Sequence, residues 1–336
     1  MSTTAEPDLS AAHREDLARA ALARYALPGA GLRFVRHGEN LTYQVTASDG
    51  RRFALRMHRP GYQTPTAIRS ELAWMEALRA SGLATPVAVS ATDGEEVAHI
   101  ADEHGHLLAV VLFKWIDGVS LSTFDGIAPW ERLGRLLARI HAHGHGWTRP
   151  PDFVRPAWDL EALVGERPRW GEPLQREVFA LDDRDLLARS RREVRRRLVA
   201  IGSASDRYGL IHGDLGFDNV LVTSNGGVAI IDFDDCGEGW FVHDIAVALY
   251  PHANRADFKD RLAALVAGYR HKGTLTDHML AELPTFVMAR RLATLGWVFS
   301  RPETEHARTL REARVRSSPD AARQFLRWSQ SHPVSR

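Results

Sequence analysis

Hydrophobic positions in the first third of the chain follow two different spacings. Residues 13–27 and 64–82 repeat apolar side chains at helical spacing, and the second stretch begins with Thr-Pro and ends at Gly82. Residues 41–58 alternate apolar and polar positions on either side of a Ser-Asp-Gly turn, and residues 95–116 have the pattern of a further strand pair. The pattern predicts a small antiparallel sheet with a helix packed on it.

After Trp130 the spacing becomes mainly helical. Amphipathic helices are predicted over residues 130–144, 183–201, 255–273 and 277–299. Only residues 210–235 interrupt this pattern, with short β-branched runs typical of strands. We therefore expect an α+β fold in which a small sheet lobe precedes a larger helical lobe, with a ligand in the cleft between them.

The interruption contains a strong hairpin signal, Asn225-Gly226, between "NVLVTS" and "GVAIID". A type I′ turn needs positive φ at both central positions, which Asn and Gly tolerate. If these two residues form the loop, Asn219 lies directly opposite Asp232. Opposed residues have Cβ atoms about 4.5–5.5 Å apart, so the two side chains would provide oxygens for one magnesium ion. The alternative is a hairpin with a polar end, in which Asp232 caps a neighbouring segment.

Asp214 lies five residues before Asn219, which is the catalytic-loop spacing of kinases. In that pattern the Asp receives the proton of the attacking hydroxyl, the Asn holds metal, and a later Asp, here Asp232, bridges the metal to the phosphates. His212 completes the His-x-Asp pattern. His-Gly-Asp occurs by chance on its own, but together with the hairpin it predicts a phosphoryl-transfer site.

These motifs resemble the aminoglycoside phosphotransferase and choline kinase superfamily. "HGDLGFDN", from His212, and "IIDFDD", ending at Asp235, carry the resemblance, which extends from about Gly38 to about Tyr269. The continuation "IDFDDCGEGWFVHDIAVALY" is most similar to the branch of type II homoserine kinases and stress-response kinases. The resemblance implies a protein-kinase-like two-lobed fold that uses Mg²⁺ and ATP, with GTP as the other nucleotide to test.

The resemblance also implies roles for individual residues. Asp214 would be the catalytic base, Asn219 and Asp232 the magnesium ligands, and His212 a structural brace of the catalytic loop. Asp244, in "HDIA", matches the helix aspartate that holds this loop through backbone N–H groups. An N-cap for the following helix is the alternative role for Asp244.

The residues themselves predict an ion pair in the sheet lobe. Glu71 lies on the same helical face as Trp74, Met75 and Leu78, so a carboxylate on an apolar stripe needs a cation. Strand alternation turns Arg56 away from its apolar neighbours, which makes it the natural partner. Kinases have lysine at this strand position, where it binds nucleotide phosphates; arginine keeps the charge but is longer and planar. The alternative is an exposed arginine beside an exposed glutamate.

Two further nucleotide contacts are implied by the resemblance. Gly38, Glu39 and Asn40 would form a nucleotide-covering turn before the first strand, with the Asn40 side chain and backbone N–H groups facing phosphate oxygens.

The apolar strand that ends near Phe113 would lead into the connection between lobes. The backbone groups of Phe113 to Ile116, which include Trp115, would bind adenine through main-chain contacts; a core strand with no ligand role is the alternative for the side chains. The expected divisions are an N-terminal lobe over 1–112, a hinge over 113–118 and a C-terminal lobe over 119–330.

Acidic and aromatic residues after the second motif are candidates for the acceptor site. Carboxylates beside an aromatic ring can bind an amine through charge and cation-π contacts. The candidates are Asp234, Asp235, Glu238 and Trp240. Solvated loop residues are the alternative.

A basic pair in the helix over residues 277–299 suggests a second acceptor contact. One arginine of Arg290-Arg291, which we take to be Arg290, should point into the lobe, where it would bind a substrate carboxylate. A salt bridge within the lobe explains it equally well. A hydroxy amino acid would use both the acids and the arginine.

Composition limits the partners and the compartment. The 336 residues include 43 Lys and Arg against 42 Asp and Glu, so no strong net charge favours nucleic acid or a membrane surface. Cys236 is the single cysteine, which excludes an internal disulfide and fits a reducing, cytoplasmic location. The chain start lacks the features of a signal peptide, and the longest apolar run, "LLAVVLF", is too short to span a bilayer. We expect a monomer or homodimer.

The predicted function is transfer of the γ-phosphoryl group of a nucleotide to a hydroxyl of a small molecule. An amino alcohol, a hydroxy amino acid and an aminoglycoside-like compound are the candidate acceptors. Two alternatives remain open: a protein Ser/Thr kinase of the stress-response type, and a regulatory pseudokinase, which the arginine at position 56 would allow.

Overall fold

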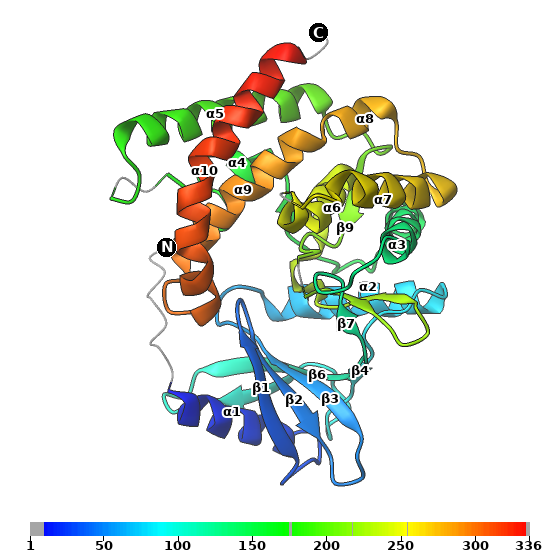
Figure 1. The fold of residues 1–336 in the computed structure, drawn as a ribbon. Coiled ribbons are helices and arrows are strands. Elements are labelled where there is room, and N and C mark those ends of the chain that lie inside the picture. The colour runs from blue at the N-terminus through cyan, green and yellow to red at the C-terminus, as the bar shows by residue number, and fades with distance from the viewer. Residues whose placement is uncertain (1–9, 175–176, 217, 254, 334–336) are drawn as a thin grey trace.

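A computed structural model describes residues 10–174, 177–216, 218–253 and 255–333 (Figure 1). The first nine residues of the predicted N-terminal lobe therefore lie outside the described part. The sheet lobe has strand order β1-β2-β3-β6-β4, with β5 paired to β6. Its elements are α1 (Ala11–Ala23), β1 (Gly31–His37), β2 (Leu41–Thr46), β3 (Arg52–Met57), α2 (Pro65–Ala80), β4 (Ala88–Val89), β5 (Ala98–Ala101) and β6 (Leu107–Lys114).

The sheet begins one strand earlier than predicted. β1 is a mostly exposed edge strand, so it has no buried face to produce an apolar alternation in the sequence. The turn at Gly38 and Asn40 therefore joins β1 to β2 instead of preceding the first strand.

Helices make up most of the second half, as predicted, and this confirms the α+β class. They are α3 (Ala128–Gly146), α4 (Leu160–Val164), α5 (Leu181–Ile201), α6 (Phe241–Leu249), α7 (Phe258–Lys272), α8 (Asp277–Ala281), α9 (Leu283–Ser300) and α10 (Glu305–Ser331). The helix predicted over 277–299 is divided into α8 and α9. The sequence pattern did not predict α10, a largely polar helix that packs on α9 and α5 (Figure 1).

Two small sheets cross the helical lobe. One has the order β11-β10-β7 and the other β8-β12-β9. Their strands are β7 (Val119–Ser120), β8 (Ala157–Trp158), β9 (Tyr208–Ile211), β10 (Val220–Val222), β11 (Val228–Ile230) and β12 (Gly237–Trp240).

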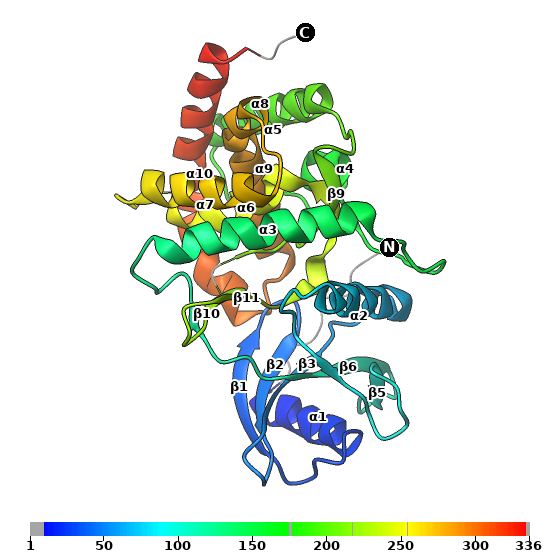
Figure 2. The ribbon, with the colours of Figure 1, turned by 90° about the vertical axis from the view of Figure 1, so that its right-hand side faces the viewer.

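Two apolar clusters divide the core. The smaller one lies between α1 and the large sheet, whereas α2 contributes Trp74 and Leu78 to the cluster that continues through the helical lobe. Figures 1 and 2 show α2 between the sheet and the helices. The predicted boundary at 113–118 remains a prediction; the chain there leaves β6 and continues to β7. None of the helices in the described ranges has the length and apolar character needed to cross a membrane.

The predicted register of the β10–β11 hairpin is wrong by one residue. Val222 pairs with Val228 and Val220 with Ile230. Gly226 has φ +74° while Asn225 is not left-handed, so the turn is not type I′. The Asn225 side chain instead accepts a hydrogen bond from the Gly227 amide (3.0 Å), and the loop is one residue longer than predicted.

Candidate active site

Asp244 of α6 holds the loop that follows β9. Its fully buried carboxylate accepts hydrogen bonds from the backbone amides of His212 and Gly213, both at 2.8 Å, and from Nε2 of His141 at 3.1 Å. The helix begins at Phe241, and its N-cap makes no side-chain capping bond, so this geometry favours the loop-holding role over the N-cap role. Gly213 needs to be glycine here, because it has φ +82° and a Cβ would lie 2.5 Å from a backbone oxygen.

The His212 ring braces the same loop from inside. Nδ1 accepts a hydrogen bond from the Asp214 amide (3.3 Å), and Nε2 donates one to the Ile231 carbonyl (3.1 Å). These two partners require the tautomer with its proton on Nε2. Burial lowers the pKa of His212, so the ring is neutral. It also packs edge-on against Phe233. The loop and the end of β11 are thereby joined through one side chain.

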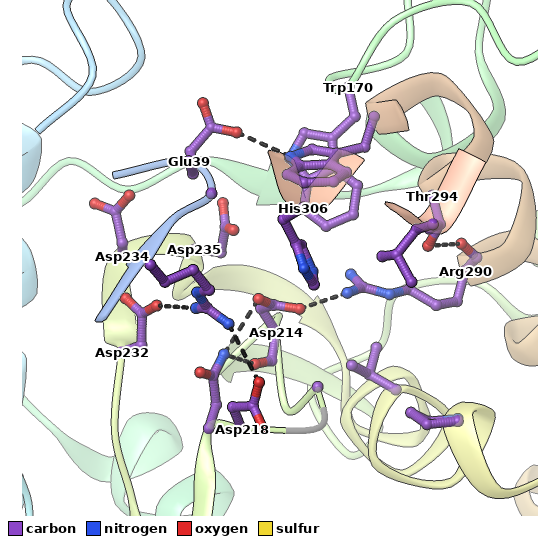
Figure 3. A pocket seen from close by; sticks show the side chains of 18 of the residues that line it. Glu39, Trp170, Asp214, Asp218, Asp232, Asp234, Asp235, Arg290, Thr294 and His306 are labelled. Carbon is purple, nitrogen blue, oxygen red and sulfur yellow. Dashed lines mark hydrogen bonds and ion pairs between the residues drawn. The ribbon is translucent and has the colours of Figure 1, made fainter. Parts of the chain in front are cut away.

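Asp214, Asn219 and Asp232 line the same pocket. Figure 3 shows Asp214 and Asp232 in it. Nδ2 of Asn219 donates to the Asp214 carbonyl (2.8 Å) and to Asp214 Oδ2 (3.2 Å). The amide of Ile231 donates to the Asn219 carbonyl, so Asn219 and Asp232 are not the directly opposed pair that was predicted. Asp232 follows β11 in a left-handed conformation (φ 63°), and both residues still line the same two pockets.

The oxygens at this wall fit a hard divalent cation. In the described part of the chain, Oδ1 of Asn219 has no hydrogen-bond donor, and the Asp232 carboxylate is 30% exposed. No group of three or more His, Cys, Asp or Glu side chains able to hold a metal occurs among the described residues. One amide oxygen and one carboxylate suit magnesium, which keeps water and phosphate oxygens as its other ligands.

Arg56 and Glu71 form a buried ion pair. Nη2 of Arg56 lies 2.7 Å from Glu71 Oε2, and the two side chains are 6% and 0% exposed, so the alternative of an exposed pair is wrong. Burial raises the pKa of Glu71 to about 7, and the attraction of Arg56 opposes this shift. Nη1 of Arg56 also lies 3.4 Å from Asp232, so the guanidinium connects α2 to the end of β11.

An apolar pocket of about 310 Å³ lies beside Arg56. Phe113, Trp115 and Ile116 line it, and the Arg56 guanidinium lies 4.9 Å from the centre of the Phe113 ring. The amides of Lys114 and Trp115 donate to the carbonyls of Val87 and Arg52, so these two N–H groups are not available to a base. Among the backbone contacts with adenine that were expected at residues 113–116, these two N–H donors are therefore excluded.

The turn between β1 and β2 is tied to both lobes. The side-chain Nδ2 of Asn40 donates to Asp234 (2.8 Å), and its Oδ1 accepts a hydrogen bond from the backbone N–H of Arg59 (3.2 Å). Both ends of this side chain are therefore hydrogen-bonded to the protein instead of facing a phosphate as expected. Glu39 accepts hydrogen bonds from Trp297 of α9 (3.0 Å) and from Arg301 (3.1 Å). Gly38 lines the larger pocket described next.

This second pocket, of about 370 Å³, opens beside Asp214 (Figure 3). Asp235 lines it and accepts a hydrogen bond from the Tyr62 hydroxyl, while Trp170 donates to the same hydroxyl (2.9 Å). Burial raises the pKa of Asp235 to about 8, although Arg169 nearby lowers it in part. A cationic ligand would favour the ionised form of this carboxyl.

Arg290 does not have the partner that was expected. Its Nη2 forms an ion pair with Oδ1 of Asp214, and the guanidinium lies 4.6 Å from the centre of the Trp170 ring. The salt-bridge alternative therefore describes Nη2 of Arg290, which is not free for a bidentate contact with a substrate carboxylate. Figure 3 shows the pair at the centre of the pocket.

The other acceptor candidates are divided between two locations. Asp234 lines the pocket, but it is buried and bound to Asn40. Glu238 lies in β12 and pairs with Arg149, and Trp240 is buried with its Nε1 bound to the Gly202 carbonyl (2.7 Å). Neither Glu238 nor Trp240 lines the two pockets, so this placement does not support a substrate role for them.

Several pocket residues were missed by the sequence analysis. Arg36 of β1 lies 3.4 Å from Asp232, and α10 contributes His306, Leu310 and Arg314. The Thr304 cap of α10 was a usable local signal, because its hydroxyl accepts the Ala307 amide in the ordinary N-cap arrangement. No local signal indicated that α10 would lie against this pocket.

Comparisons with known proteins identify the family to which the chain is related. A model of the phosphotransferase enzyme family matches residues 31–282. The chain is 23% identical to amicoumacin kinase of Bacillus subtilis, covering 84% of each chain, and 26% identical to homoserine kinase of Rhizobium rhizogenes, covering 64% of this chain and 63% of that one. A solved structure of a microcompartment-associated aminopropanol kinase superposes with a TM-score of 0.85 at 34% identity, covering 96% of this chain and 100% of the other.

Proposed function

The chain belongs to the phosphotransferase enzyme family, and we propose that it transfers the γ-phosphoryl group of ATP to the hydroxyl of a small amino-bearing acceptor. The observation that carries this proposal is the position of Asp214, Asn219 and Asp232. They lie where the apolar pocket and the acidic pocket meet, since Asn219 and Asp232 line both and Asp214 lines the second.

The nucleotide would occupy the apolar pocket. Its base would lie beside Phe113 and Trp115, and its phosphates would extend toward Arg56 and Arg36. Asn219 and Asp232 would hold magnesium, which neutralises charge on the phosphates during transfer. Arg56 is anchored by Glu71, so its planar head is held in one orientation, which reduces the entropy lost when it binds phosphate.

Asp214 would accept the proton of the attacking hydroxyl. Arg290 holds one carboxylate oxygen and Asn219 the other, so the group is oriented before the acceptor arrives. Each carboxylate oxygen has two lone pairs, so both retain the capacity to accept a hydroxyl hydrogen.

The acceptor would bring an ammonium group to Asp235. A cation beside this buried carboxyl compensates the cost of its ionisation, and the Trp170 ring lines the same pocket. The similarity to an aminopropanol kinase at 34% identity supports an acceptor of this type.

The side chains that line the pocket argue against a protein acceptor. Trp170, Trp297 of α9 and His306 of α10 line it around Asp214, which favours a small molecule over a Ser or Thr of a folded protein. The presence of Asp214, Asn219 and Asp232 together argues against a pseudokinase.

Turnover with defined acceptors tests the proposal. Purified protein with Mg²⁺ and either ATP or GTP is assayed for nucleoside diphosphate release in the presence of amino alcohols and hydroxy amino acids. Asp214→Asn should lower kcat about 10²- to 10⁴-fold, as expected for loss of a general base. Asp206→Asn, on the exposed surface, is the control. Near-normal turnover by Asp214→Asn would refute the assignment.

A further inference from the structure

Part of the pocket beside Asp214 is built by a segment of the chain beyond the family match. That match ends at residue 282, whereas α9 and α10 begin at Leu283 and Glu305. Both helices contribute side chains to the pocket. In addition, α10 contacts β1 (Figure 1). The residues that they contribute are Arg290, Thr294, Trp297, His306, Leu310 and Arg314. These six side chains are therefore candidates for contacts with the acceptor that lie outside the family match.

Arg314 is a pocket-lining cation without a carboxylate partner. Within the described ranges, no Asp or Glu forms an ion pair with its guanidinium, which lies 4.5 Å from the centre of the Tyr250 ring. Its Nε is buried and has no hydrogen-bond partner in the same ranges. Burial lowers the pKa of Arg314, Arg291 and Arg290 add to the lowering, and Tyr250 opposes it.

Arg290 contributes a second unfilled donor to this wall. Its Nη2 is engaged by Asp214, but Nη1 is buried and has no hydrogen-bond partner among the described residues. By contrast, Arg36 on the other side of the pocket lies near both Asp218 (3.8 Å) and Asp232 (3.4 Å). A half-buried cation that lacks an anion is costly, and a planar guanidinium is suited to a carboxylate.

The acidic wall and the cationic wall are on different sides of Asp214. Figure 3 shows Asp232, Asp234 and Asp235 on one side and Arg290 on the other. We propose that Arg314, together with Nη1 of Arg290, forms an anion subsite that binds the carboxylate of the acceptor. The preferred acceptor is then a hydroxy amino acid, with its ammonium group at Asp235 and its hydroxyl at Asp214. This subsite rests on the proposed function, because it concerns the acceptor of that reaction.

Matched acceptor pairs isolate the carboxylate. L-threonine and 1-amino-2-propanol, L-serine and ethanolamine, and L-homoserine and 3-amino-1-propanol differ within each pair only by that group. The readout is the ratio of kcat/KM for the two members of each pair, measured as ADP release with ATP and Mg²⁺. A charge-assisted contact of this kind predicts a preference of about 10- to 100-fold for the carboxylated member of at least one pair.

Variants assign the preference to Arg314. Arg314→Gln should reduce the ratio of the preferred pair toward one, and Arg314→Lys should retain part of it. Arg316→Gln removes a charge from the same helix at a side chain that is 75% exposed, and it should keep the wild-type ratio. Thermal unfolding of each variant shows whether it is folded; if Arg314→Gln is not, Arg314→Lys decides.

The outcomes separate the two proposals. The anion subsite is overturned if amino alcohols are turned over and the carboxylate gives no increase in kcat/KM. It is also overturned if Arg314→Gln and Arg314→Lys leave the ratio of kcat/KM unchanged. In both cases the proposed function still stands. No turnover of any of the six compounds overturns an amino-bearing small acceptor, and the subsite with it.

Discussion

Replacing Asp244 by asparagine tests how the loop that carries Asp214 is held. Oδ2 of Asp244 accepts the His212 amide and His141 Nε2, and Oδ1 accepts the Gly213 amide. Asparagine has the same shape, but one of its two groups is an NH₂ donor. In the better orientation its oxygen faces His212 and His141, while its NH₂ meets the N–H of Gly213. Two buried donors then lack acceptors.

The expected loss of folding stability follows from these contacts. Each buried donor without an acceptor costs about 1–3 kcal/mol, and removing the buried negative charge returns part of that. We expect the free energy of unfolding to fall by about 2–5 kcal/mol. For a chain of 336 residues, the unfolding entropy predicts a decrease in Tm of about 3–7 °C. A small displacement of Asp214 should lower kcat about 10²-fold.

Urea unfolding followed by tryptophan fluorescence measures the stability, and steady-state ADP release measures kcat and KM. Asp244 does not line the apolar pocket beside Phe113, so KM for ATP should change less than kcat. Asp206→Asn, a neutralisation at an exposed aspartate, is the control. If Asp244→Asn unfolds at the same urea concentration as the control and keeps its kcat, the carboxylate does not position the loop.

Three further predictions address the pocket walls. Asp232→Ala should lower turnover more than about 10³-fold while far-UV circular dichroism stays unchanged, because this side chain is partly exposed; near-normal transfer with Mg²⁺ would exclude a metal role. Arg56→Lys should keep the contact with Glu71 but lose the reach to Asp232, so KM for ATP should rise several-fold; an unchanged nucleotide titration contradicts this. The pKa of Asp235 is raised to about 8, above the pKa of this carboxyl in the unfolded chain. The stability that the carboxyl contributes is therefore fully present below its unfolded-state pKa and is lost as pH rises through about 8. Asp235→Asn should therefore gain stability relative to the wild type between about pH 4 and 8, and a constant difference in urea midpoint across that range would refute the shift.

The local parts of the site were predictable from the sequence. Asp214 and Asn219 are five residues apart in one loop, so their proximity follows from chain geometry. Glu71 and Arg56 were paired because helical and strand periodicity determine which face each side chain occupies. Asp244 was identified by resemblance to a family motif, and the structure adds the two loop amides and the histidine that it binds.

The length of the hairpin loop could not be predicted from the local sequence pattern. Asn225-Gly226 correctly marked a reversal, but the Asn225 side chain accepts the Gly227 amide and lengthens the loop by one residue. Side-chain competition of this kind is not visible in an apolar alternation. Asp232 still lines the site, because a left-handed backbone at this residue follows the strand.

The sequence by itself determined the fold class, the phosphoryl-transfer motif and the buried ion pair, because each depends on periodicity or short spacing. Only the tertiary structure decided what surrounds Asp214. Arg290 meets Asp214 across 76 residues, and Arg314 reaches the same pocket on a helix with no recognised motif. Their positions depend on how α9 and α10 pack against the lobe, and many sequences satisfy such packing without leaving a local pattern.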